Sequence, residues 1–140
     1  MPPALTPALA LEYVHELSAD VLAGAILDAA GELLAGAPEL AGPARTLLDA
    51  GGDAAELEVA TVDGVVCAVR TPAHAAVAIC GRFAIAGVVR QDIRAALAAL
   101  EGRPPGARSA LLEPLSDDAE PALTSAANRL ISAAQRGSGA

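Results

Sequence analysis

The chain has 140 residues, 54% of them hydrophobic, and a net charge of −8, which fits one acidic domain of ordinary size. It contains no lysine, so a Walker-type phosphate loop and Schiff-base chemistry, which both need that residue, are excluded. The acidity disfavours nucleic acid and anionic membrane surfaces as partners, because both carry negative charge themselves.

The amino-terminal part predicts a helix followed by a β-hairpin. The helix covers about residues 6–18, with Thr6 as its cap and an apolar stripe at four-residue spacing. The stripe consists of Leu9, Tyr13, Val14 and Leu17. Residues 21–27 form a short apolar run, residues 28–31 supply a turn, and residues 32–35 return as a second strand.

A second helix is expected after a start that contains two prolines. Pro38 and Pro43 bracket its beginning, regular helix starts near Gly42, and Gly51 and Gly52 end it. Its inward side is expected to hold Leu40, Ala44, Leu47 and Leu48.

Three strands are predicted next. Residues 56–62 alternate strictly between polar and apolar, the pattern of a strand with one wet face. Asp63 and Gly64 form a strong hairpin signal, and residues 65–70 and 75–80 follow as strands.

The last helix of the domain has the clearest helical period in the chain. Its apolar side consists of Val89, Ile93, Ala96, Leu97 and Leu100. The element order α-β-β-α-β-β-β-α, with the strands in meandering hairpins, predicts an α/β (α+β) sandwich. Its five-stranded sheet is expected to be mostly antiparallel, with helices on both faces.

The carboxyl-terminal part differs in character from residues 5–101, which we interpret as one domain. Residues 102–118 contain Pro104 and Pro105 and are predicted to be a linker. Residues 119–136 are predicted to form an amphipathic helix, with one face made of Leu123, Ala127, Leu130, Ile131 and Ala134. Such a helix either packs on its own domain or occupies a groove on a partner, and nothing in the sequence separates the two.

Side chains that carry out catalysis are few. Ser18 lies three residues after His15, but no third orienting group and no oxyanion site accompany them. The sequence does not decide whether Cys67 and Cys80 are neighbours. Both are expected to be buried free thiols, because too few donors accompany them for a zinc site. We therefore expect no catalytic, cofactor-binding or metal-binding residues and no enzymatic activity.

The location is expected to be cytoplasmic. No basic residue precedes Arg45, so an amino-terminal secretory signal is not expected, and no apolar stretch is long enough to span a bilayer. In that compartment the two cysteines are reduced. The abundance of alanine and the use of arginine in place of lysine indicate a bacterial source with GC-rich coding.

The order of the predicted elements, and the residues that separate them, resemble the roadblock family of dynein light chains and bacterial regulators of small GTPases. The matching stretches are residues 25–35, 44–48, 58–69 with the Asp63-Gly64 turn, and 79–82 leading into residues 89–100. The resemblance covers about residues 5–101 and rests on the joint order of these patterns. It implies a profilin-like fold with a five-stranded sheet between helices.

Members of that family typically pair through the third strand of each subunit while their second helices pack together. They act as scaffolds or regulators of small Ras-like GTPases, so the resemblance implies a homodimer that binds a GTPase. The implied dimer interface consists of Leu40, Ala44, Leu47, Leu48, Glu56, Leu57, Glu58, Val59, Ala60 and Thr61. Pairing relieves an exposed strand edge, although Glu56 and Glu58 are equally suited to discourage it.

Arg82, Arg90 and Arg94 are the candidate partner-binding residues outside that interface. They belong either to a basic stripe that meets an acidic partner or to a solvated face. The alternative function is that of a small-molecule sensor in a bacterial signalling system. Such a sensor needs convergent polar groups in an apolar cavity, and the predicted sheet offers few of them.

Overall fold

The structure, a computed structural model, describes residues 6–102 and 119–138. Its elements in chain order are α1 (Pro7–Leu17), β1 (Val21–Asp28), β2 (Leu33–Gly36), the short 3₁₀ helix η1 (Pro38–Leu40), α2 (Ala41–Ala50), β3 (Glu56–Thr61), β4 (Gly64–Arg70), β5 (His74–Cys80), α3 (Ala86–Leu100) and α4 (Ala119–Ser138). Apart from η1, the order as far as α3 is the predicted one.

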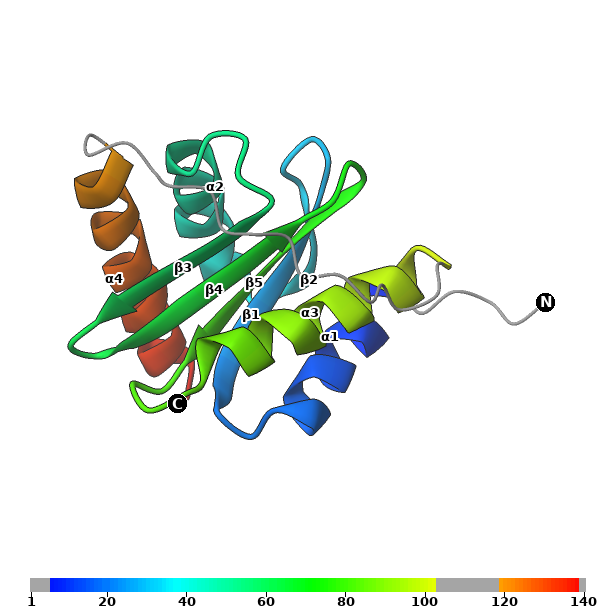
Figure 1. The fold of residues 1–140 in the computed structure, drawn as a ribbon, viewed down its shortest axis with the longest axis horizontal. Helices are drawn as coiled ribbons and strands as arrows, with labels where there is room; N and C mark the ends of the chain where they lie inside the picture. Colours follow the sequence, from blue (N-terminus) through cyan, green and yellow to red (C-terminus); the bar gives the residue numbers. More distant parts are fainter. Residues whose placement is uncertain (1–5, 103–118, 139–140) are drawn as a thin grey trace.

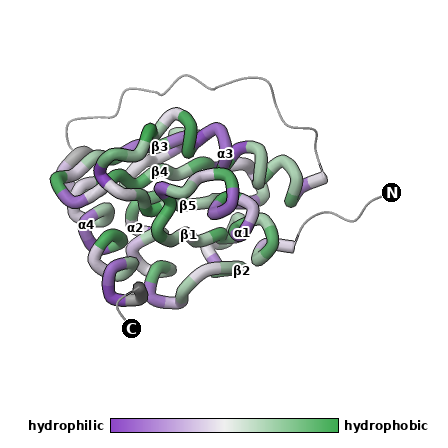
Figure 2. Tube along the Cα trace, turned by 90° about the horizontal axis from the view of Figure 1, so that it is seen from below, coloured by the Kyte–Doolittle hydropathy of each residue, from purple (hydrophilic) through white to green (hydrophobic). Residues whose placement is uncertain are grey.

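The five strands form one sheet in the order β2-β1-β5-β4-β3, and every pair of neighbours is antiparallel. Helices α1 and α3 cover one face, whereas α2 and α4 cover the other (Figures 1 and 2). The predicted antiparallel sheet with helices on both faces is therefore confirmed. Its two outer strands are β2 and β3.

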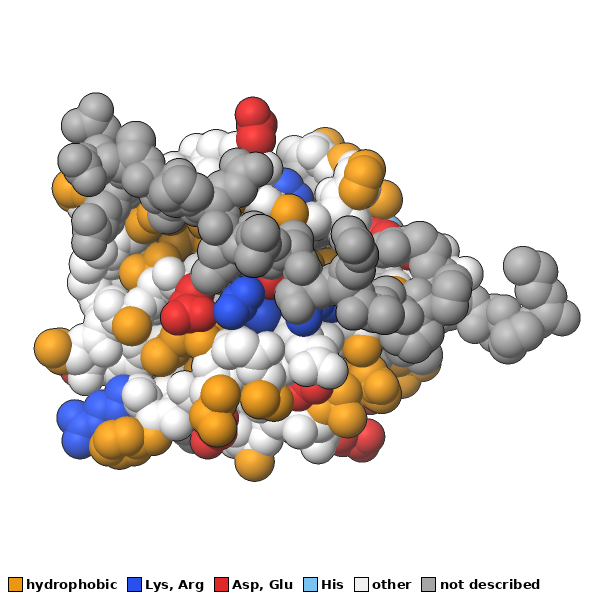
Figure 3. Space-filling view, viewed as in Figure 1, with side chains coloured by type: hydrophobic (Ala, Val, Ile, Leu, Met, Phe, Trp, Pro, Cys, Tyr) orange, Lys and Arg blue, Asp and Glu red, His pale blue; other side chains and the backbone are white. Residues whose placement is uncertain are grey.

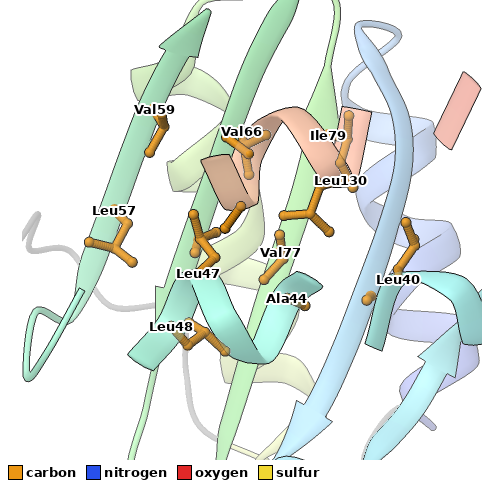
Figure 4. Packing of buried hydrophobic residues seen from close by; sticks show 14 of the residues in the cluster. Leu40, Ala44, Leu47, Leu48, Leu57, Val59, Val66, Val77, Ile79 and Leu130 are labelled. Carbon is orange, nitrogen blue, oxygen red and sulfur yellow. The ribbon is translucent and has the colours of Figure 1, made fainter. Parts of the chain in front are cut away.

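Each face of the sheet has its own hydrophobic core. Under α2 and α4, Leu47 and Leu130 meet Val66 and Val77 of the sheet (Figure 4). Under α1 and α3, Ile93 belongs to a second cluster. Because both faces of β4 and β5 are covered, these strands consist of continuous apolar runs, in contrast to the alternating pattern of β3.

The β3–β4 turn differs from the predicted one. β3 ends at Thr61 and β4 begins at Gly64, so the two turn residues are Val62 and Asp63. Gly64 does not have a positive φ angle, but a Cβ atom at its position would lie 2.6 Å from the carbonyl oxygen of Cys80. The close approach of β5 explains this glycine, and the turn itself does not require it.

Helix α1 packs on the sheet through only one residue of the predicted stripe, Val14. Ala10 and Val14 are buried, whereas Leu9, Tyr13 and Leu17 lie at the surface. The helix lies beside α3 and contacts β1 and β2. A small side chain at position 10 permits close approach to the sheet, and the larger residues of the stripe are left about half covered.

Helix α4 docks on the face of the sheet that it shares with α2. Its buried residues are Leu123, Ala126, Ala127, Leu130, Ile131, Ala133 and Ala134. They pack against α2, β3 and β4, so this helix lies on its own domain. Residues 103–118 of the predicted linker lie outside the described residues.

Candidate functional site

The outer strand β3 has β4 as its only strand neighbour within the described ranges. In an antiparallel pair the backbone hydrogen bonds alternate along each strand. The N–H of Arg70 donates to the carbonyl oxygen of Ala55, just before β3, so every second residue after Ala55 also faces β4. The N–H groups of Glu56, Glu58 and Ala60 therefore point away from the sheet. β3 itself lies at the outer margin of the sheet (Figure 2).

The acidic side chains of β3 are neutralised from α3. The Glu56 side chain is only 3% exposed, and its two oxygens accept hydrogen bonds from Nη1 of Arg94 at 2.8 and 2.6 Å. Nη1 of Arg90 donates to the same carboxylate at 2.9 Å, and its Nη2 lies 3.4 Å from the carboxylate of Glu58. The charges of β3 are thus balanced within the chain, so they present little repulsion to a second strand.

The three candidate arginines have different surroundings. Arg90 and Arg94 are mostly buried and committed to Glu56, so they form neither a solvated face nor a free basic stripe. Their spacing of four residues, which leads to repulsion on an isolated helix, lets both reach one carboxylate. Arg82 lies on the loop before α3, where its guanidinium carbon is 4.9 Å from the ring centre of Phe83.

The α2 part of the implied dimer interface is already covered. Leu40, Ala44, Leu47 and Leu48 are all buried, and they belong to the core that α2 forms with α4 and the sheet (Figure 4). While α4 is docked, these residues have almost no apolar surface left for a second copy. Among the β3 residues of that interface, Glu58 and Ala60 are exposed and Thr61 is half-buried.

Cys67 and Cys80 are buried neighbours on β4 and β5. Cys67 pairs with Ala78 and Cys80 with Val65, so the cysteines occupy diagonal positions on the face under α1 and α3. The hydrogen bond between the two thiols, together with burial, raises the pKa of the Cys67 thiol. A thiol held in its neutral form is a poor nucleophile, which fits a packing role for Cys67. The same hydrogen bond lowers the pKa of the Cys80 thiol.

His15 and Ser18 do not form a hydrogen-bonded pair in the part of the chain that the structure describes. Ser18 is buried, and its N–H donates to Val14 at the end of α1, while His15 is exposed. No three His, Cys, Asp or Glu residues among those described gather as they would around a metal ion. None of the described helices has the length and apolar character needed to cross a bilayer.

One polar cluster was not anticipated from the sequence. Nδ1 of His74 lies 2.7 Å from Oε2 of Glu101, and the hydroxyl of Thr71 donates to the same oxygen. These contacts tie the β4–β5 turn to the end of α3. No local pattern could have indicated the pair, because 27 positions separate His74 from Glu101.

A cavity of about 440 Å³ opens at this end of the sheet, between the β1–β2 turn, α2 and the β4–β5 turn. Its charged and polar lining residues are Asp28, Arg45, Asp49, Arg70, Thr71 and His74. Arg45 and Arg70 each donate to a backbone carbonyl, at 3.0 and 2.8 Å. Neither is paired with a carboxylate in the described part of the chain, so both retain hydrogen-bonding capacity.

The comparisons with known proteins identify the fold. No family model matches the sequence, and no curated protein resembles it significantly. Among solved structures, a Roadblock/LC7 domain from Streptomyces avermitilis superposes with a TM-score of 0.57 at 12% sequence identity. The match covers 70% of this chain and 97% of that domain, so the chain has the roadblock fold predicted from its sequence.

The shared carboxylate predicts a marked difference between two similar substitutions on β3. Glu56→Gln should lower the free energy of unfolding by about 2 kcal/mol, because it removes the charge that balances two largely buried arginines. Glu58→Gln, two residues further on, should cost less than about 0.5 kcal/mol, because that side chain is 36% exposed and has one longer ion pair. Urea unfolding followed by circular dichroism measures both, and equal losses would contradict the assigned role of Glu56.

Proposed function

We propose that this chain, which has the roadblock fold, is a non-catalytic regulatory scaffold that pairs with a second copy through β3 and binds a small Ras-like GTPase. The observation that carries the pairing is the open margin of β3. Its outward N–H groups lack strand partners among the described residues, and its two carboxylates are balanced by α3. Unpaired strand edges of this kind favour association with another strand.

The proposed dimer is a symmetric one. Two copies of β3, placed antiparallel about a two-fold axis, would join both sheets into one. Because α4 occupies the face next to α2, we expect the strand to make the main contact and the second helices to contribute little. This arrangement differs in that respect from the interface that the family resemblance implies.

The GTPase half of the proposal is supported by the fold and by the family resemblance of residues 5–101. A regulator of this kind needs a platform and no catalytic groups of its own. We place the protein in the cytoplasm, where its thiols stay reduced.

Substitution of Ala60 by proline tests the pairing strand. The N–H of Ala60 points away from β4, so Ala60→Pro removes an outward donor and adds bulk at the margin without breaking the β3–β4 ladder. We expect the dimer to dissociate at least about tenfold more readily, because each copy loses a hydrogen bond of about 1 kcal/mol. Light scattering across a dilution series measures the change.

The matched control is Ala60→Thr, which keeps the N–H group and suits a strand. It should dimerise like the parent chain, and circular dichroism should show that both variants are folded. An Ala60→Pro variant that dimerises as tightly as Ala60→Thr would exclude pairing through this edge.

A binding assay with small GTPases tests the second half of the proposal, that the chain binds a small Ras-like GTPase. The full chain, immobilised, is offered the small Ras-like GTPases of its host one at a time, loaded with GDP or with a non-hydrolysable GTP analogue. We expect one of them to bind with micromolar affinity or better and to prefer one nucleotide state. If all of them bind no better than an unrelated acidic protein, the GTPase proposal fails.

The cavity near Arg45 and Arg70 favours small-molecule sensing as a second candidate function. Two guanidinium groups that no carboxylate of the described residues pairs with suit a ligand that carries a carboxylate or phosphate. Native mass spectrometry discriminates between the two functions, because a sensor purified gently retains an anionic metabolite and a scaffold does not.

A further inference from the structure

The most exposed large hydrophobic side chains of the described residues lie at one end of the domain. Val62 and Phe83 are each 83% exposed and Ile85 is 69% exposed, and Val88 follows on the first turn of α3. Together with Arg82 we call these residues the Phe83 patch. Most of the remaining exposed apolar residues, including the α1 stripe, are about half covered.

The patch comes from two segments that the fold brings to the same end of the sheet. Val62 belongs to the β3–β4 turn, and the other residues belong to the β5–α3 loop and the start of α3. Val65 pairs with Cys80, so the bases of the turn and the loop are in contact. Both segments lie at the lower left in Figure 1, where Figure 3 shows hydrophobic and basic side chains at the surface.

Exposure of Phe83 is unfavourable for the isolated chain. It is the only phenylalanine of 140 residues, and both cores are built without it. Burial of such a side chain contributes about 1.5–3 kcal/mol, and the folded domain does not gain this stabilisation. Large aromatic side chains that protrude from a surface are typical anchors of protein interfaces.

Arg82 gives the patch its charge preference. Its guanidinium group lies against the ring of Phe83, and no carboxylate pairs with it in the described part of the chain. Arg90 and Arg94, a short distance along, are by contrast both occupied by Glu56. Two copies meeting patch to patch would bring two unbalanced guanidinium groups together, so a carboxylate on a different protein is the better match.

We propose that the Phe83 patch is a docking surface for a partner protein with an apolar pocket bordered by aspartate or glutamate. Phe83 enters the pocket, Arg82 pairs with the bordering carboxylates, and Val62, Ile85 and Val88 contact its apolar rim. The inference rests on the scaffold role proposed above. It depends neither on pairing through β3 nor on the partner being a GTPase.

Site-specific photocrosslinking in the full chain tests this surface. A variant of the chain that carries benzoyl-phenylalanine at position 85 is expressed in the native host and irradiated. The crosslinked peptides are then sequenced by mass spectrometry. We expect one partner protein, captured through an apolar segment that contains aspartate or glutamate. The yield should fall at least tenfold when Arg82→Gln or Phe83→Ser is added.

The control places the same photoreactive residue at Leu9, on the exposed stripe of α1, where that partner should not be captured. Circular dichroism verifies that every variant is folded. Capture alone does not support the proposal. It is overturned if no protein is crosslinked, if only a second copy is captured, if the captured segment lacks carboxylates, or if Arg82→Gln leaves the yield unchanged.

The result is distinguishable from failure of the proposed function. A partner captured at position 85 that is not a GTPase supports the patch, even if no GTPase binds the immobilised chain. A GTPase that binds the chain equally well with and without Arg82→Gln and Phe83→Ser supports the proposed function, even if the crosslinking at position 85 overturns the patch.

Discussion

The docking of α4 against α2 and the sheet decides which surfaces of this domain remain for other molecules. Its apolar side fills the layer over β3 and β4, and α2 is thereby buried on the side that would otherwise face outward. Among the surfaces that the described residues leave uncovered are a strand margin, where N–H groups of β3 point outward, and the end of the sheet that carries the Phe83 patch. The proposed pairing uses the first of these surfaces, and the proposed docking site uses the second.

The Glu56 carboxylate makes the first of those surfaces usable. An outer strand with two acids would ordinarily repel a neighbour, but two arginines from α3 neutralise them and tie the strand to the opposite helical layer. Arg90 and Arg94 are both occupied by these contacts. Arg82, on the loop before α3, pairs with no carboxylate of the described residues. One buried carboxylate thus occupies both arginines of α3 and links the pairing strand to that helix.

Much of the fold could be predicted from local patterns. The alternation of residues 56–62 and the period of the helix ending at Leu100 are signals that tertiary contacts reinforce. The covering of α2 could not be predicted, because the segment that leads into the terminal helix has no pattern that indicates where this helix packs. The role of Glu56 could not be predicted either. A sequence does not indicate whether Arg90 and Arg94 face solvent or pair with a carboxylate such as Glu56, which lies 34 positions before Arg90.

The central claim, that β3 pairs with its counterpart in a second copy, is tested most directly by amide hydrogen exchange resolved by residue. The N–H groups of Leu57 and Val59 face β4 and should be protected at every protein concentration. Those of Glu58 and Ala60 should exchange quickly in dilute solution and slow down as the concentration rises through the dimerisation range. If Glu58 and Ala60 exchange as unpaired amides at all concentrations, the strand margin is not an interface.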